Sequence, residues 1–147
     1  MKLTEYLKNI GIDKSIKNIT GSLLIEESKI TEIDLPELQS IEYGLYIHNS
    51  QQLKQIDLPK LQSVGNNLYI YDNKQLTQIN LPELQSIGKD LFIYNNPQLT
   101  QIDLPKLQSV GNYLSIDGNL RLKILNNQNY ESEIQIKQVL KTQVGKK

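Results

Sequence analysis

The apolar residues of the chain recur with a fixed spacing of 23 residues. The motif Ile-Asp-Leu-Pro-x-Leu-Gln-Ser begins at Ile33 and Ile56, returns with Asn in place of Asp at Ile79, and begins again at Ile102. Self-similarity at such a period indicates stacked supersecondary units, each of which buries its apolar face only against its neighbours. The sequence therefore predicts a mainly β solenoid with four full rungs of 23 residues.

Each repeat unit predicts two strands. With the first Ile as position 1, apolar residues occupy positions 1, 3, 6, 9, 13, 15 and 21. Positions 13 and 15, for example Leu68 and Ile70, alternate with polar or aromatic neighbours, which is typical of a strand. Positions 1 and 3 predict a second strand, which should end at the proline of position 4 because proline cannot donate to a ladder. We expect the glycine of position 10, such as Gly88, to supply a positive φ before the first strand.

The two ends of the repeat predict caps. Residues 19–30 match positions 9 to 21 if one residue is missing before Ile30, which predicts a degenerate N-terminal rung. Before it, Leu3, Leu7 and Ile10 have the spacing of a short amphipathic helix that could cover the first rung. The expected single domain, 1–147, consists of an N-terminal cap (1–18), the repeat solenoid (19–125) and a C-terminal cap (126–147), the caps being short helices.

The repeat also carries a family resemblance. The stretch LQSVGNNLYIYDNKQLTQINLPELQSIG resembles the leucine-rich repeats of the receptor L-domain type, found in insulin-receptor-like ectodomains and fungal GPI-anchored cell-wall proteins. The resemblance covers about residues 19 to 125 and implies a right-handed β-helix-like solenoid. It also implies that Asn73, Asn96 and Asn119, at position 18, point inward and bond main-chain groups of the turn. The motif is specific for the architecture and says almost nothing about function.

The composition removes several classes of function. The chain has no cysteine and one histidine, so it has no disulfide, no thiolate metal site and no cluster of histidine ligands. Sixteen Lys and Arg residues balance sixteen Asp and Glu residues, so no global field attracts nucleic acid or anionic lipid. We therefore expect a protein that is not an enzyme, with no cofactor, no bound metal, and neither nucleic acid nor a membrane as partner.

The polar residues also form four repeated columns. The Gln and Ser residues at positions 7 and 8 recur in every rung, which favours side-chain bonds to backbone groups at a turn over a single catalytic constellation. The column Asp34, Asp57, Asn80 and Asp103 could hold calcium, but one carboxylate per rung gives a line of oxygens and favours a solvated face. Glu and Lys alternate at position 5, which favours attraction between neighbouring rungs.

The first residues of the chain bear on its location. Residues 1–14 mix charges with apolar residues, and no apolar run reaches the length of a signal peptide or a membrane span. We expect cytoplasmic localisation, and an extracellular location only if the chain is a fragment of a longer protein.

The outward side of the first strand holds six of the nine aromatic residues and no Lys or Arg. Stacked aromatic columns there could be a structural ladder, since cross-strand aromatic pairs stabilise sheets. They could also form a binding surface, because exposed tyrosines bury a large area at low entropic cost, and the two interpretations are compatible. His48 lies in these columns and is expected to be a surface histidine and not a general base. The candidate partner-binding residues are Tyr46, His48, Tyr69, Tyr71, Phe92, Tyr94, Tyr113, Asp90 and Asp117.

From this surface we expect a non-enzymatic protein-binding module that is a monomer and binds another, unidentified protein. The alternative is a carbohydrate-binding or structural fragment of the cell-surface class, because aromatic faces also stack on sugars.

Overall fold

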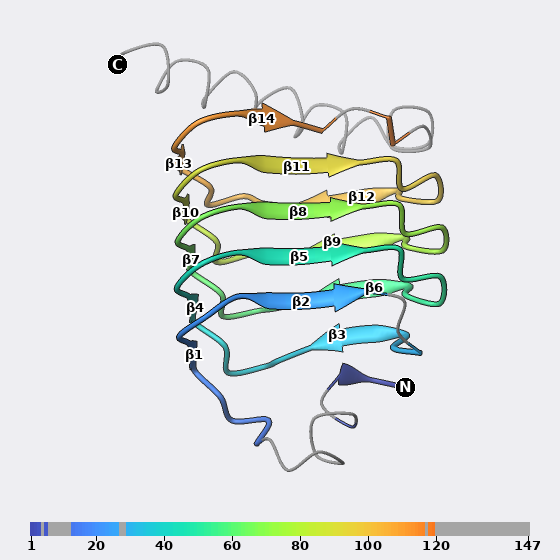
Figure 1. The fold of residues 1–147 in the computed structure, drawn as a ribbon, viewed down its shortest axis with the longest axis horizontal. Helices are drawn as coiled ribbons and strands as arrows, with labels where there is room; N and C mark the ends of the chain where they lie inside the picture. The colour runs from blue at the N-terminus through green and yellow to red at the C-terminus, as the bar shows by residue number, and fades with distance from the viewer. Residues whose placement is uncertain (4, 6–12, 27–28, 117, 120–147) are drawn as a thin grey trace.

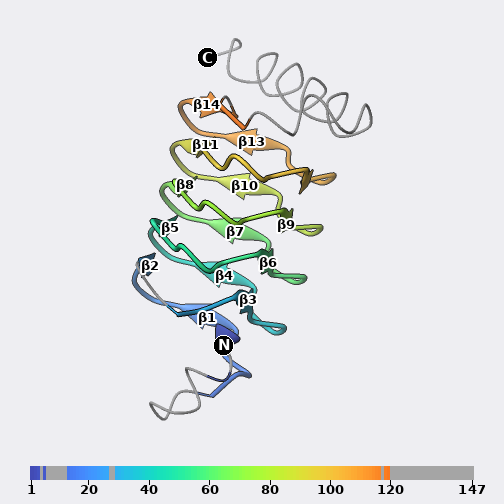
Figure 2. The same ribbon diagram turned by 90° about the vertical axis from the view of Figure 1, so that its right-hand side faces the viewer.

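The computed structural model describes residues 1–3, 5, 13–26, 29–116, 118 and 119. Within them the chain rises from the N-terminus as a right-handed coil, and each full turn adds a strand to each of three parallel sheets (Figure 1). The predicted mainly β solenoid is therefore confirmed, with almost no helix in the described residues. Figure 2 shows the rungs stacked in order along the axis.

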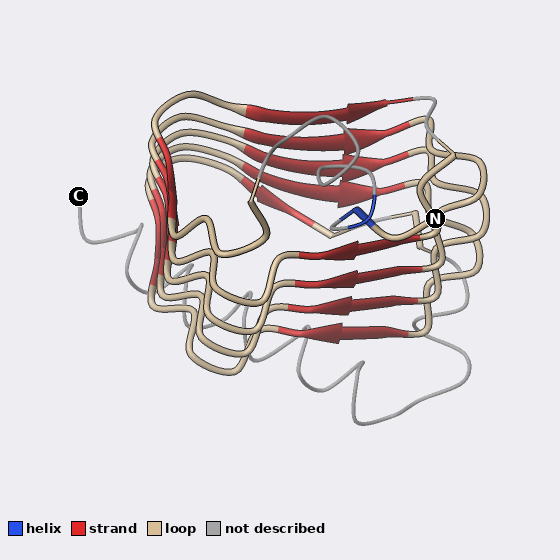
Figure 3. Cartoon of the chain, turned by 90° about the horizontal axis from the view of Figure 1, so that it is seen from below, coloured by secondary structure: helices blue, strands red, loops and turns tan. Residues whose placement is uncertain are grey.

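The predicted first strand forms sheet 1. Its strands are β2 (Leu23–Glu26), β5 (Leu45–His48), β8 (Leu68–Tyr71), β11 (Leu91–Tyr94) and β14 (Leu114–Ser115). The second predicted strand forms sheet 2, from β3 (Glu32–Asp34), β6 (Gln55–Asp57), β9 (Gln78–Asn80) and β12 (Gln101–Asp103). Seen along the axis, these two sheets face each other across the interior (Figure 3). The degenerate N-terminal rung is also confirmed, since β2 pairs with β5 in the predicted register, Leu23 opposite Leu45.

A third sheet, which the sequence did not predict, closes one end of the cross-section. Its strands are β1 (Asn18–Ile19), β4 (Ser40–Ile41), β7 (Ser63–Val64), β10 (Ser86–Ile87) and β13 (Ser109–Val110). The Ser and Gln columns were expected to form side-chain bonds at a turn. The serines instead begin the strands of this sheet, and backbone bonds such as Gln62 N–H to Gln39 O, at 2.8 Å, join neighbouring rungs.

The core is a stack of similar layers, one for each rung. The apolar side chains predicted to point inward do so in the described rungs, with Leu68, Ile70, Leu91 and Ile93 all 0% exposed. Burial of one such side chain contributes about 1.5–3 kcal/mol, so each rung is held mainly by its contacts above and below. The apolar period thus fixes which side of each strand faces the core.

Proline makes the predicted corner. Leu61 N–H donates to Leu58 O at 3.3 Å across Pro59 and Lys60, and the same bond recurs in the other full rungs. This places Pro59 at the second residue of a four-residue turn, where its fixed φ is suitable. The strands of sheet 2 end at position 2, two residues before the proline at which they were predicted to end, and the buried Leu of position 3 begins the turn.

The glycines of position 10 do not have the positive φ that the sequence predicted. Gly118, at position 17, is the positive-φ glycine among the described residues, and Gly65, Gly88 and Gly111 have ordinary φ values. A Cβ at Gly88 would overlap the carbonyl oxygen of Gly65 in the rung below. These glycines therefore allow two backbones to approach closely, which lets Gly88 N–H reach Val64 O at 2.9 Å.

A ladder of buried amides joins the rungs at position 18, as the resemblance implied. Asn73 and Asn96 are 0% exposed, and Asn119 is 3% exposed. The Asn96 amide nitrogen donates to Ile70 O at 3.1 Å, and its oxygen accepts from Asn73 N–H at 3.2 Å. Ser50 occupies the same buried position in the first full rung.

The residue before each of these buried positions has a left-handed backbone. The φ values are 53° for Asn49, 56° for Asp72, 54° for Asn95 and 78° for Gly118. Asn, Asp and Gly are the residues that tolerate this conformation best. The turn after each strand of sheet 1 therefore depends on position 17.

Residues at the N-terminus lie against the first strand of sheet 2. Lys2 forms a parallel bridge with Glu32, Thr31 N–H donates to Met1 O at 2.7 Å, and Leu3 is 2% exposed within the core. Leu3 and Glu5 have helical backbone, while Leu7, Ile10 and the whole predicted C-terminal cap lie outside the described residues. The division of the chain at residues 18 and 125 stays a prediction.

Candidate functional site

The candidate site is the outward side of sheet 1. In β5, Leu45 and Ile47 are buried, whereas Tyr46 and His48 point outward and are half-buried. The parallel register places Tyr46 beside Tyr69 and His48 beside Tyr71. The outward side chains of β5, β8 and β11 therefore form two columns along the axis. We call them together the aromatic face: the position-14 column is Tyr46, Tyr69 and Phe92, and the position-16 column is His48, Tyr71 and Tyr94.

Both columns are stacks of rings. In the position-16 column the ring centroids of His48 and Tyr71 are 4.8 Å apart with an interplanar angle of 5°, and Tyr71 and Tyr94 are 4.8 Å apart at 1°. In the position-14 column Tyr69 stacks on Phe92 at 5.0 Å and 9°. The ladder interpretation is therefore correct in its geometry, and each such pair contributes about 0.5–1.5 kcal/mol beyond its burial.

The lower end of the position-14 column has a different contact. Tyr46 meets Tyr69 edge to face, with centroids 5.5 Å apart and an interplanar angle of 76°. A Cβ at Gly44 would overlap the Tyr46 ring, so the glycine at position 12 of this rung provides the space that the ring occupies. Gly44 therefore contributes to the site although it has no side chain.

Polar side chains at position 12 hold the phenols of the rung below. The Tyr69 hydroxyl donates to Asp90 Oδ2 at 3.1 Å, and Asn67 Nδ2 donates to the Tyr46 hydroxyl oxygen at 3.4 Å. Asp90 in turn accepts from Tyr113 N–H at 3.0 Å. Burial, followed by the hydrogen bond to Asp90 and its charge, raises the pKa of Tyr69, so this phenol keeps its proton well above neutral pH.

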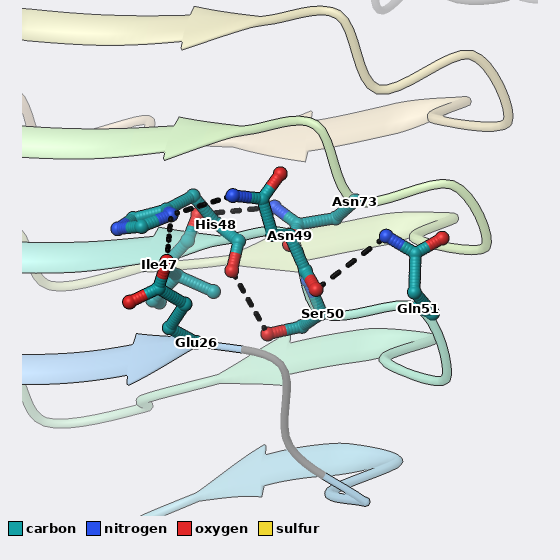
Figure 4. A network of polar contacts seen from close by, with 7 residues as sticks. All are labelled: Glu26, Ile47, His48, Asn49, Ser50, Gln51 and Asn73. Atoms are coloured by element: carbon teal, nitrogen blue, oxygen red, sulfur yellow. Dashed lines mark hydrogen bonds and ion pairs between the residues drawn. The ribbon is translucent and has the colours of Figure 1, made fainter.

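His48 begins the position-16 column beside an acid (Figure 4). Its Nδ1 lies 3.6 Å from Glu26 Oε1 and 3.2 Å from Asn49 Nδ2. The His48 side chain is only 14% exposed, compared with 44% for Glu26. The predicted surface histidine is thus a half-buried member of the ring stack, with one face on Tyr71.

The charges around the aromatic face are negative. Glu26 lies at its lower end, Asp90 borders the position-14 column, and Asp72 follows Tyr71 at the end of β8. Burial, then Tyr71 and then the charge of Asp72 raise the pKa of Tyr94. Asp72 also accepts from the side chain of Asn95, the residue after Tyr94. β2, β5, β8 and β11 contain no Lys or Arg.

The other polar columns serve the stack of rungs. Asn80 Nδ2 donates to Asp57 Oδ1 at 2.8 Å in the position-2 column, and this amide separates two carboxylates. In the position-5 column Lys60 pairs with Glu37 at 2.9 Å and Lys106 with Glu83 at 2.8 Å, as the alternating charges predicted. Across the described part of the chain no three His, Cys, Asp or Glu residues come together as metal ligands would, and no helix there could span a bilayer.

The structure brings together eight of the nine predicted site residues on this face, and Asp117 lies outside the described residues. Tyr94 is 38% exposed and Tyr113 65% exposed, so these two rings offer the most surface. Sequence reasoning missed Asp72 and Asn67. The signal that could have indicated Asp72 is its column, because every residue at position 17 is of a type that tolerates left-handed backbone: Asn49, Asp72, Asn95 and Gly118.

Comparison with known families identifies the class of the chain. Residues 2–120 match the BspA type leucine rich repeat region, in six copies. The match covers well over half of the sequence, and the chain belongs to this family of leucine-rich repeat proteins. Such repeats commonly mediate protein interactions, and the family is generally non-enzymatic. Searches of curated proteins and of solved structures found no match.

Proposed function

We propose that this protein is a non-enzymatic protein-binding module whose contact surface is the aromatic face. The observation that carries the proposal is the pair of ring columns, which collect tyrosines on one side of one sheet, with Tyr94 exposed in the position-16 column and Tyr113 exposed just before β14. Tyrosine is enriched in the residues that contribute most to protein interfaces. The family adds support, because leucine-rich repeats commonly mediate protein interactions.

Ring stacking favours a protein partner over the carbohydrate alternative. A sugar ring packs on the open face of an aromatic side chain. Tyr71 has His48 stacked on one side and Tyr94 on the other, and Phe92 covers one side of Tyr69. The rings therefore present mainly their edges and hydroxyl groups, which suit the mixed polar and apolar contacts of a protein surface. The receptor L-domain subtype and cytoplasmic localisation stay predictions.

The test is affinity capture from the native cell with matched variants. Tyr94→Ala with Tyr113→Ser removes the two most exposed rings of the candidate site, and serine is the natural residue at position 12 of the N-terminal rung, where Ser22 stands. We expect captured partner to fall by at least about thirtyfold, the equivalent of a hot-spot loss of about 2 kcal/mol.

The control changes the opposite side of the rung. Lys60→Ala with Lys106→Ala breaks the two exposed ion pairs at the proline corner and should leave capture unchanged. If the tyrosine variant captures the partner normally, the ring columns only stabilise the solenoid and the partner uses another face.

A further inference from the structure

We infer that the partner of the aromatic face presents a basic segment, an extended stretch of chain rich in Arg or Lys. This inference rests on the proposed function and adds the chemistry of the partner. The negative charges that border the ring columns and the exposed ring of Tyr94 support it.

The border of the aromatic face is acidic on three sides. Glu26 lies next to His48 at the lower end, Asp90 lies beside Tyr69, and Asp72 follows β8 and accepts from the side chain of Asn95, the residue after Tyr94. The lysines nearest in sequence, Lys74 and Lys89, are in the turns at the two ends of the strands. The net charge of the chain is zero, so the negative potential is local to this face.

Two of these carboxylates are held in place by the fold. Asp90 accepts from the Tyr69 hydroxyl and from Tyr113 N–H, and Asp72 accepts from the Asn95 side chain. A carboxylate fixed in this way loses little side-chain entropy when a cation binds to it. Asp72 and Asp90 also lie on opposite borders of the ring columns, so one segment that crosses the face can reach both.

The rings add a place for the planar head group of arginine. Phe92 ends the position-14 column: it stacks on Tyr69, and the residue paired with it in the next rung is Ser115, which has no ring. Tyr94, beside it on β11, is 38% exposed. An aromatic face near a carboxylate attracts a guanidinium group by cation–π and charge interactions together.

The same charges argue against other occupants. Two copies of this chain that met through their aromatic faces would bring Asp72 and Asp90 against like charges, which is unfavourable. Phosphate groups would meet no cation on the strands of the face. A basic protein segment is therefore the occupant that the surface fits.

The repeat itself supplies variants that remove the charges and keep the hydrogen bonds. Asp72→Asn places at position 17 the residue that stands there as Asn49 and Asn95, and it retains the oxygen that accepts from Asn95. Asp90→Asn places at position 12 the residue that stands there as Asn67, which also accepts a backbone N–H. The double variant D72N/D90N should therefore fold as the parent does.

The matched control removes two charges from another face. Asp57→Asn with Asp103→Asn changes the position-2 column of sheet 2, where Asn80 is already present. Both double variants have the same net charge, so a difference between them reports where the charge lies. The probes are three synthetic peptides of about eight residues, enough to cross the face at ~3.3 Å per residue. One alternates Arg with Gly and Ser, one has Glu in place of Arg, and one is neutral.

Binding is measured by titration of each peptide into isotope-labelled protein, followed by the NMR signals of His48 and of the tyrosine rings. We expect the arginine peptide to bind, with an affinity that falls as the salt concentration is raised. The D72N/D90N variant should lower this affinity about five- to tenfold, whereas D57N/D103N should leave it unchanged. Equal weakening by both double variants, or no binding of the arginine peptide, overturns the inference.

The two proposals can fail separately. If Tyr94→Ala with Tyr113→Ser abolishes capture of the native partner while D72N/D90N captures it at parental strength, the face binds a protein but the basic partner is wrong. If the neutral or acidic peptide binds better than the arginine peptide, the partner chemistry is also wrong. A dimer in sedimentation that Tyr113→Ser dissociates would identify a second copy of the chain as the occupant.

Discussion

The buried amide ladder makes Asn96 a sensitive polar position of the solenoid. Its side chain donates to Ile70 O and accepts from Asn73 N–H, both within the buried interior. Asn96→Ala leaves that carbonyl and that N–H without these partners in a site that is 0% exposed. Each buried group left unsatisfied costs about 1–3 kcal/mol. We therefore expect a loss of about 2–6 kcal/mol, a large part of the ~5–15 kcal/mol that such a domain has in total.

Urea unfolding followed by circular dichroism measures this loss. Asn112→Ala is the control, because Asn112 is an exposed asparagine of the same solenoid and should change stability by less than ~0.5 kcal/mol. Asn96→Ser should lie between the two, because serine occupies the same column as Ser50 and can still form one bond. A loss below about 1 kcal/mol for Asn96→Ala would refute the assignment of rung-to-rung stability to this ladder.

Two further predictions concern the glycines and the phenols. Gly88→Ala should destabilise the chain by about 1–3 kcal/mol or more in urea unfolding because its Cβ would overlap Gly65 O, whereas Gly21→Ala, with open space around it, should change stability by less than about 1 kcal/mol. Because the pKa of Tyr69 is raised, the folded chain keeps a proton on this phenol that the unfolded chain loses near pH 10. The contribution of Tyr69 to the free energy of unfolding is therefore complete below that pH and is lost as the pH rises through the folded pKa. Tyr69→Phe should therefore flatten the fall in unfolding free energy between pH 9 and 11, and an unchanged slope would contradict this account.

The sequence predicted the parts of the fold in which apolar core residues alternate with polar or aromatic outward residues in every repeat. Leu68 and Ile70 alternate with Tyr69 and Tyr71, so the side of β8 that faces the core could be identified from the pattern alone. The missing residue between Ile25 and Ile30 could be located because the spacing to the next rung changes from 22 to 23 residues, as the strand pairing confirms.

The third sheet could not be predicted in the same way. Its strands have two residues each, and a segment such as Ser63–Val64 is too short to show any alternation. The role of Gly88 was also hidden, because the absence of a side chain suits both a positive φ and a close backbone approach. Only the distance between neighbouring rungs distinguishes the two explanations, and that distance is a property of the assembled stack.

The contacts that hold the tyrosine hydroxyls were hidden for a different reason. Tyr69 bonds to Asp90 and Tyr46 to Asn67, and each pair is 21 residues apart because it joins position 14 of one rung to position 12 of the next. Comparison of equivalent positions at the 23-residue period therefore does not reveal them. Phe92 fits this pairing, since it has no hydroxyl and the next rung has Tyr113 at position 12.

The ladder and binding interpretations of the aromatic face are linked by the energetics of association. Stacking on both sides holds the Tyr71 ring, and the bond to Asp90 holds Tyr69, so these side chains are ordered before any partner arrives. Ordering a free side chain at an interface costs about 0.5–1.5 kcal/mol, and rings already fixed in a stack avoid most of that cost. A partner of rigid shape can then bind without reorganising sheet 1. The contacts that stabilise the solenoid thus also prepare its surface for recognition.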